Sequence, residues 1–262
     1  MAKAKTKITF LGTATVVPTA GHDTASFLIN GRHLVDTGWY AIIKMLNYGF
    51  NPMDLDTVFI SHCHHDHYIG LPHVIFYHSM RKKERQDRPP VKIVGPAEDI
   101  QLVTGLARDF LQIDRFSLME YNVEVVPIVP GESLELEDLH VDTCSTVHPV
   151  QGLCYRFTDK QTQASFVYTG DTAYHPPIAK HARGVSLLIH EASHGPESPD
   201  DPGVWGHAGA PDAARIAQLA GVEQLALIHC PESLAQQAIT TAQRIFPNTF
   251  LPEDGQTVEI SG

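Results

Sequence analysis

The chain has 262 residues, 43% of them hydrophobic and 19% charged, which is enough apolar material to bury a full core. Its 30 acidic residues outnumber the 19 lysines and arginines. The net charge of −11 argues against a general nucleic-acid binder, because neutralising phosphates requires basic residues. No apolar run approaches the length that spans a membrane, and the four cysteines form no CxxC pair. We therefore expect a cytoplasmic protein with one domain over residues 1–262.

A basic stretch at residues 1–7 opens the chain, and the apolar run after it is too short for a signal-peptide core. Short β-branched or aromatic runs bounded by turn residues are typical of strands. They predict opening strands at residues 7–11, 25–29 and 33–35, with Gly31 in the turn between the second and third.

Helical periodicity predicts four helices, at residues 39–48, 99–112, 211–220 and 233–246. The third has a proline in its first turn and Gly221 just beyond its end. In the fourth, Ser233 and Gln236 form a capping-box pattern, and Pro247 prevents continuation. The charged residues 80–90 are predicted to form an exposed loop. Strands and helices interspersed along the chain indicate an α/β or α+β fold.

Five later apolar runs each end in a residue that can bind a metal or move a proton. These residues are His62 after residues 58–61, His148 after 141–147, Asp171 after 166–168, His190 and Glu191 after 185–189, and His229 after 225–228. A single histidine at a strand end is usually a hydrogen-bonded, half-buried residue. Five such positions indicate one site, because strand ends hold functional side chains on a rigid scaffold.

Residues 61–67 read Ser-His-Cys-His-His-Asp-His, with four histidines and one aspartate in seven positions. A solvated loop gains nothing from this composition, whereas imidazole and carboxylate are ligands of transition metals. The pattern His62-x-His64-x-Asp66-His67 resembles, without a gap, the first metal motif of the metallo-β-lactamase superfamily. His148, Asp171 and His229 follow in the order of its later motifs, and the resemblance runs from Phe10 to Gly255.

The resemblance implies a four-layer αββα sandwich with a dinuclear site at one edge. It implies one metal held by His62, His64 and His148, a second held by Asp66, His67 and His229, and Asp171 bridging the two. Asp36 resembles an early aspartate of the family that orients ligands, although an aspartate that accepts turn N–H bonds is an equal alternative.

Five neutral and two anionic donors suit two Zn²⁺ ions better than Mg²⁺ or Ca²⁺, with Mn²⁺ or Fe²⁺ as alternatives. Flavo-diiron relatives in the superfamily carry a carboxylate where this chain has His64. The imidazole at this position therefore favours zinc and hydrolysis.

Within the superfamily, residues 11–19, 190–193 and 206–214 resemble ribonuclease Z and related phosphodiesterases. That likeness implies that Glu191 and His207 protonate the leaving oxygen while a hydroxide bridging the metals attacks phosphorus. Asp66, Glu191 and His207 are therefore the predicted catalytic residues. Taken singly, Glu191 also fits a salt-bridged carboxylate at a strand end, and His207 a surface histidine before a helix.

Ribonuclease Z carries a long arm that grips tRNA, often inserted between the third ligand motif and the bridging aspartate. Here residues 149–170 leave room only for a hairpin between His148 and Asp171. The basic run at residues 81–88 could contact phosphates instead, although a solvated face is the ordinary interpretation of such a run. A smaller phosphodiester, such as a cyclic nucleotide or cyclic phosphate, is thus predicted at least as strongly as tRNA.

Two other classes stay open: an acyl hydrolase of the same fold, acting on a β-lactam, lactone or thioester, and a non-catalytic scaffold. The sequence also leaves a homodimer open. The remaining histidines near the motifs are expected on the surface or in the pocket wall, namely His65, His175, His181 and His194. Residues 12–23 are expected to form a connecting loop.

Overall fold

The computed structural model describes residues 4–116, 119, 122–201 and 205–262, so residues 1–3 of the basic N-terminal stretch lie outside the described part. Two seven-stranded sheets form its centre. The first has the order β14 (Thr257–Ile260), β1 (Thr6–Gly12), β2 (Ser26–Ile29), β3 (His33–Val35), β4 (Thr57–Phe59), β5 (Val91–Pro96) and β6 (Val123–Ile128). The second has the order β13 (Thr249–Phe250), β12 (Gln224–Ile228), β11 (Leu187–Glu191), β10 (Ser165–Tyr168), β9 (Leu153–Asp159), β8 (Leu139–Ser145) and β7 (Ser133–Glu135).

Strand direction brings the predicted site residues to one edge of the second sheet. Strands β8, β9 and β10 pair antiparallel, and β10, β11 and β12 pair parallel. Strands β8, β10, β11 and β12 therefore all run the same way, and their carboxyl ends meet at one edge. In the first sheet, β4 lies parallel to β3 and β5 and ends just before Ser61 and His62.

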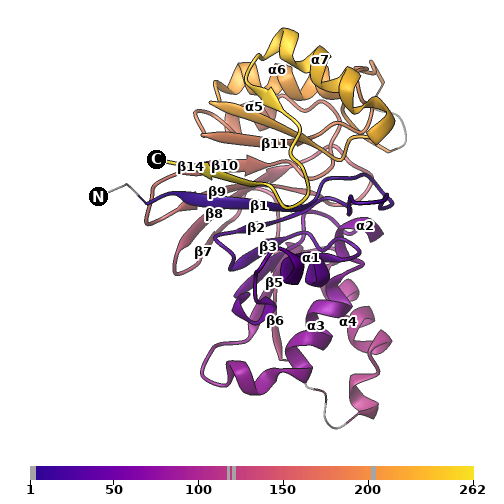
Figure 1. Ribbon diagram of the computed structural model, residues 1–262, viewed down its shortest axis with the longest axis vertical. Coiled ribbons are helices and arrows are strands. Elements are labelled where there is room, and N and C mark those ends of the chain that lie inside the picture. The colour runs from indigo at the N-terminus through magenta and orange to yellow at the C-terminus, as the bar shows by residue number, and fades with distance from the viewer. Residues whose placement is uncertain (1–3, 117–118, 120–121, 202–204) are drawn as a thin grey trace.

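The helices cover the outer faces of the two sheets (Figure 1). These are α1 (Ala41–Asn47), α3 (Leu71–Met80) and α4 (Ile100–Phe110) on the first sheet and α5 (Pro177–His181), α6 (Ala210–Ala220) and α7 (Ala235–Ile245) on the second. The short α2 (His65–Tyr68) lies at the edge of the sandwich instead. Aromatic side chains such as Phe27, Phe157 and Phe166 fill the core between the sheets. A second apolar layer packs α1, α3 and α4 on the first sheet, and a third packs α5, α6 and α7 on the second. These layers confirm the predicted αββα sandwich.

The four predicted helices exist, but one predicted cap is wrong. Helix α6 ends at Gly221 in the left-handed conformation, as predicted. Ser233 does not cap α7, because it lies inside the short 3₁₀ helix Glu232–Leu234 and the N-cap residue of α7 is Leu234, without a side-chain cap. Helix α3 was not predicted, because its apolar residues lie on all sides of the helix and form no apolar stripe with helical period. Val74 and Ile75 are buried, for example, while Phe76 is exposed.

The charged segment at residues 80–90 is more structured than the predicted exposed loop. Met80 ends α3, and Lys82–Arg85 form a 3₁₀ helix. Arg85 and Arg88 both bond to the carboxylate of Asp56, and the Arg85 side chain is only 7% exposed. Two of the basic residues considered for phosphate contacts are therefore paired with an acidic side chain.

The interval between His148 and Asp171 is a plain hairpin, as predicted, made of β9 and β10 in antiparallel register. Further 3₁₀ helices lie at Pro52–Asp54 and Ile113–Arg115. Within the described residues, no helix is both long and apolar enough to cross a membrane.

Candidate metal centre and active site

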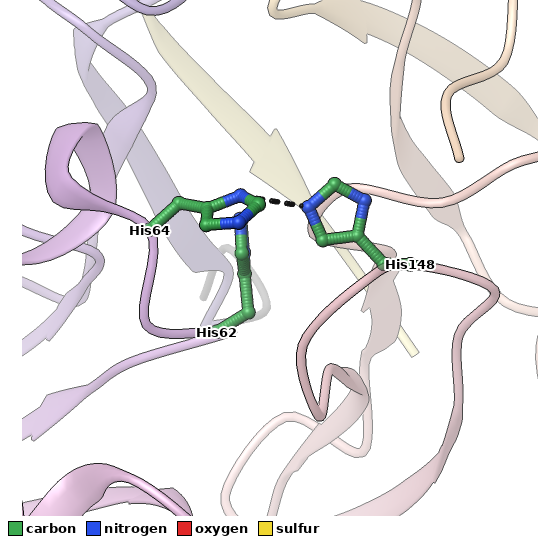
Figure 2. A group of neighbouring side chains, drawn as sticks. All are labelled: His62, His64 and His148. Carbon is green, nitrogen blue, oxygen red and sulfur yellow. Dashed lines mark hydrogen bonds between the residues drawn. The ribbon is translucent and has the colours of Figure 1, made fainter. Parts of the chain in front are cut away.

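Three histidine rings converge at the edge between the two sheets. His62 and His64 lie in the loop between β4 and α2, and His148 follows β8 (Figure 2). Nδ1 of His64 and Nε2 of His148 are 2.9 Å apart, and each of the three residues offers a ring nitrogen within 4.8 Å of the others. Gly206 bounds this group, because its carbonyl accepts a hydrogen bond from Nδ1 of His148 at 3.1 Å. A Cβ on Gly206 would lie 2.6 Å from the carbonyl oxygen of Val147.

A second group consists of Asp66 and His67 on α2 and His229 just after β12. Oδ2 of Asp66 lies 3.1 Å from Nε2 of His229 and 3.2 Å from Nε2 of His67. His229 has a φ of 51° and donates its backbone N–H to the carbonyl of Thr13, which anchors this strand end to the first sheet.

Asp171 lies between the two groups. Its Oδ2 is 3.7 Å from Nε2 of His62, 3.5 Å from Nε2 of His67 and 3.7 Å from Nε2 of His229. The preceding residue, Gly170, has a φ of 59°, and a Cβ there would lie 2.9 Å from Cβ of Ser61. Glycine is therefore required at the turn that delivers Asp171 to the centre.

The seven side chains fit metal ions. Nε2 of His62, Nε2 of His67 and Oδ1 of Asp171 are buried and have no hydrogen-bond partner among the described residues. Such orphaned atoms are costly unless a ligand satisfies them. Burial lowers the pKa of His62, and it is also the main cause of the lowered pKa values of His64 and His148, which therefore present neutral imidazoles.

The histidines of the second group titrate in the opposite direction. Burial lowers the pKa of His67, but Asp171, Asp36 and Asp66 outweigh it and raise the pKa well above its usual range. Asp171 and Asp66 likewise outweigh burial and raise the pKa of His229. In a fold without metal, these protons balance the buried carboxylates. A bound cation would take their place, so metal binding would release protons.

Asp36 holds His67 and the start of the metal motif in place. Its Oδ2 accepts hydrogen bonds from Nδ1 of His67 at 2.8 Å, the Ser61 hydroxyl at 2.8 Å and the Tyr168 hydroxyl at 2.7 Å. Its Oδ1 accepts the backbone N–H of Ser61 at 2.7 Å. Asp36 therefore makes the ligand-orienting contact and accepts a backbone N–H bond as well.

Glu191 and His207 meet beside Asp171. Nδ1 of His207 lies 3.0 Å from Oε1 of Glu191 and 3.8 Å from Oδ2 of Asp171. Oε1 of Glu191 also accepts the backbone N–H of Thr172 at 2.6 Å, which fixes the buried carboxylate at the end of β11. Burial lowers the pKa of His207, but the hydrogen bond and charge of Glu191 outweigh it, so the net shift is upward.

Sequence reasoning missed three hydroxyls that support the site. The Ser193 hydroxyl connects Oε2 of Glu191 with Nδ1 of His229, the latter at 2.9 Å. Ser61 and Tyr168 both donate to Asp36. Ser193 lies two residues after Glu191, within the stretch 190–193 that resembles ribonuclease Z. Tyr168 fits the apolar strand pattern, so nothing in the sequence indicates a role for its hydroxyl.

The histidines left unassigned lie in different places. His65 is exposed, and His175 is partly buried with Nε2 3.4 Å from the Ser145 hydroxyl. The His194 ring centroid lies 6.4 Å from that of His207, beside the candidate active site. His181 lies near two cysteines. Residues 13–25 connect β1 to β2, as expected except that Gly12 ends β1, and Thr13 bonds to both His229 and Asp254.

Known proteins resemble this chain over nearly its whole length. Ribonuclease Z of Methanothermobacter thermautotrophicus is 26% identical, with 97% of this chain and 96% of the relative covered. The metallo-β-lactamase fold protein YhfI of Bacillus subtilis superposes with a TM-score of 0.83 at 24% identity, covering 98% of this chain and all of that one. The short form of human tRNase Z superposes with a TM-score of 0.74 at 21% identity, covering 96% and 98%.

Fold, site and relatives together define a metal-dependent hydrolase of the metallo-β-lactamase superfamily. More narrowly, the chain belongs to the family described as anti-Pycsar protein Apyc1, whose model matches residues 6–200.

Proposed function

We propose that the protein is a two-metal phosphodiesterase that cleaves a small phosphodiester. The observation that carries this proposal is the contact between Glu191 and His207, 3.0 Å apart, directly beside the proposed bridging ligand Asp171. Acyl transfer by two metals needs no such pair, whereas expulsion of an alkoxide from phosphorus benefits from a proton donor. The relative named ribonuclease Z supports phosphorus chemistry on the same fold.

The proposed metal ligands are those predicted from sequence. His62, His64 and His148 would hold one ion, and Asp66, His67 and His229 the other, with Asp171 shared. Zinc is the favoured ion, because imidazole and carboxylate donors suit it. Bound ions of this kind stabilise charge on phosphoryl oxygens and lower the pKa of water toward neutrality.

His207 would supply the proton for the leaving group. Its Nδ1 is held by Glu191, so Nε2 is the atom left to face a substrate. Its raised pKa keeps the ring protonated closer to neutral pH. Glu191 would keep the ring in position and stabilise its charge, and Ser193 would couple this pair to His229.

Three features support a small substrate over tRNA. The interval from His148 to Asp171 is filled by the β9–β10 hairpin. The alignment with ribonuclease Z runs over 305 positions against 262 residues here, so that relative contains segments with no counterpart in this chain. A cavity of about 260 Å³ borders His207 and is lined by Tyr174 and Arg215 among others, just under the roughly 300–1,000 Å³ of small-molecule sites.

A substrate panel tests the proposal on zinc-loaded protein. Cyclic nucleotides and bis(p-nitrophenyl) phosphate should be hydrolysed far faster than nitrocefin, a lactone or S-lactoylglutathione. The reverse order would favour the acyl-hydrolase alternative. Efficient 3′ trimming of precursor tRNA at physiological salt would refute the small-substrate part and leave the phosphodiesterase assignment standing.

The metal count is tested separately. Elemental analysis should find at least two transition-metal ions per chain. His64→Ala should lose metal and most activity, because it removes one of the three histidine ligands of the first ion. Wild-type protein that is active after complete metal removal would contradict the dinuclear proposal.

A further inference from the structure

A second group of metal-ligating side chains lies outside the candidate active site. Cys144, Cys154 and His181 each offer a ligand atom, and these atoms all lie within 4.8 Å of one another. The ideal tetrahedral zinc site, with zinc–sulfur bonds of about 2.3 Å, spaces its donors by roughly 3.5–4 Å, within that limit. None of the three is among the seven proposed ligands of the active site.

The two cysteines are placed together by the sheet. Cys144 on β8 and Cys154 on β9 are directly opposite in the antiparallel register. Directly opposite residues point to the same face, with Cβ atoms about 4.5–5.5 Å apart. That face is the one covered by helices, because Cys154 belongs to the apolar layer under α5, α6 and α7, and Cys144 packs against it.

His181 closes the group from the last turn of α5, which packs on β8. Its Nε2 is buried and has no hydrogen-bond partner among the described residues. The position of this helix end is fixed by Arg156 on β9, which donates hydrogen bonds to the carbonyls of His181 at 2.8 Å and Arg183 at 3.2 Å. Burial and the nearby Arg156 lower the pKa of His181, so its imidazole is neutral and able to bind a cation.

The charges around the group suit a divalent ion. Two thiolates and a neutral imidazole around one Zn²⁺ sum to zero, which a half-buried position tolerates better than an isolated charge. The next cross-strand pair on the same face of the ladder is Asp142 and Arg156, whose formal charges also sum to zero. Two sulfurs and one nitrogen form a soft donor set that favours zinc over Mg²⁺ or Ca²⁺.

We propose that Cys144, Cys154 and His181 form a zinc site distinct from the catalytic centre, with water completing the tetrahedron. The ion joins β8, β9 and α5. Strand β8 leads into His148 four residues after Cys144, and α5 follows Asp171. The site therefore braces the two chain segments that deliver these proposed ligands to the catalytic centre.

The main alternative to zinc binding is a disulfide between Cys144 and Cys154. Burial and the neighbouring Cys144 raise the pKa of Cys154 well above its usual range, so the thiolate that oxidation requires is scarce. Zinc overcomes that penalty, because a coordinated thiol is deprotonated outright.

Cobalt substitution distinguishes this site from the catalytic one. Metal-free, reduced wild-type protein is loaded with Co²⁺ and its near-ultraviolet absorption is recorded. The seven proposed catalytic-site ligands include no cysteine, so thiolate-to-cobalt charge-transfer absorption reports the second site. We expect this band in the wild type, with saturation at one cobalt–thiolate centre per chain and loss on addition of Zn²⁺.

Substitutions identify the residues that produce this absorption band. Cys144→Ser should remove it and His181→Ala should weaken it or shift it, each with one Zn²⁺ per chain fewer by elemental analysis. Cys230→Ser and His175→Ala are matched controls that should keep both the band and the zinc. Both test residues are only partly buried, so the variants should fold, and circular dichroism checks this.

Three results would overturn the proposal. They are a wild type without the band, a band that survives both Cys144→Ser and His181→Ala, and thiol titration showing that Cys144 and Cys154 are oxidised to each other in freshly purified protein. None of these outcomes depends on phosphodiesterase activity, so this inference and the proposed function can fail independently.

Discussion

At the scale of single residues, Asp36 shows how one buried carboxylate organises a metal motif. It has a φ of 53°, an unusual backbone conformation for a residue other than glycine, and its side chain accepts four hydrogen bonds from Ser61, His67 and Tyr168. The bond to Nδ1 of His67 leaves Nε2 facing the centre, which is the nitrogen that a metal needs.

Asp36→Asn tests that role. An amide keeps the shape but offers only one acceptor oxygen to four donors, so at least one donor loses its partner and His67 loses its fixed tautomer. Metal affinity should fall roughly 10–100-fold, as for other groups that orient ligands. Titration with a competing chelator measures it. Wild-type affinity in a folded variant would show that Asp36 serves the fold alone.

His207→Ala tests the proposed proton donor. General acid catalysis is typically worth about 10²–10⁴ in rate, but only for a poor leaving group. A cyclic nucleotide expels an alkoxide, whereas p-nitrophenolate leaves readily without a proton. The variant should lose most cyclic-nucleotide hydrolysis and little bis(p-nitrophenyl) phosphate hydrolysis, with metal content unchanged. Equal losses on both substrates would mean that His207 positions substrate or supports the metals.

At the scale of elements, α3 joins the 3₁₀ helix at Pro52–Asp54 through a histidine that stays neutral. Nε2 of His78 donates to the carbonyl of Pro52 at 2.9 Å. Burial and the nearby Arg85 and Arg88 lower the pKa of His78 to about 4. The unfolded chain therefore takes up this proton at a higher pH than the folded protein does.

This difference predicts a pH dependence of stability. The contribution of His78 is fully present above about pH 6.5 and is lost as the pH falls toward 4, by on the order of 2–3 kcal/mol. His78→Gln cannot titrate and should lose less free energy of unfolding between pH 7 and pH 4.5, measured by urea denaturation. His73→Gln, at an exposed position on the same helix, is the matched control. Parallel pH profiles for wild type and His78→Gln would refute this assignment.

At the scale of the whole molecule, the candidate centre joins the two sheets. His62 follows β4 of the first sheet, while His148, Asp171 and His229 follow strands of the second. Strands β1 and β14, from opposite ends of the chain, pair in one sheet, which supports the proposal of a single domain over residues 1–262.

Because the centre spans both sheets, metal removal should destabilise the entire fold. An ion bound only by the folded state at 100 times its Kd adds about 2.7 kcal/mol, or roughly 5–10 °C in Tm for a chain of this size. Calorimetry of metal-free and zinc-loaded protein measures the shift. Cys144→Ser should retain the part due to the catalytic centre. An unchanged Tm after complete metal removal would contradict metal ligation across the sheets.

The motif at residues 62–67 and the strands before His148, Asp171, Glu191 and His229 could be predicted from sequence. They could be predicted because strand propensity and metal-ligating residue types are both visible as patterns within a few consecutive residues. Runs of β-branched or aromatic residues bounded by turn residues also located the first three strands, and only limits of the first two differ, by one residue.

Other features depend on contacts between segments that are far apart in the chain, and such contacts leave no pattern in the local sequence. The pairing of Arg85 and Arg88 with Asp56 was not apparent, although most of residues 80–90 are exposed as predicted. The hydroxyl of Tyr168 reaches Asp36 across 132 residues of chain. Cys144 and Cys154 became neighbours only through strand register, and His181 joined them only because α5 packs on β8. Sequence alone thus determined which metal-ligating and proton-transferring residues the chain contains. Tertiary packing decided which of these side chains meet in one site.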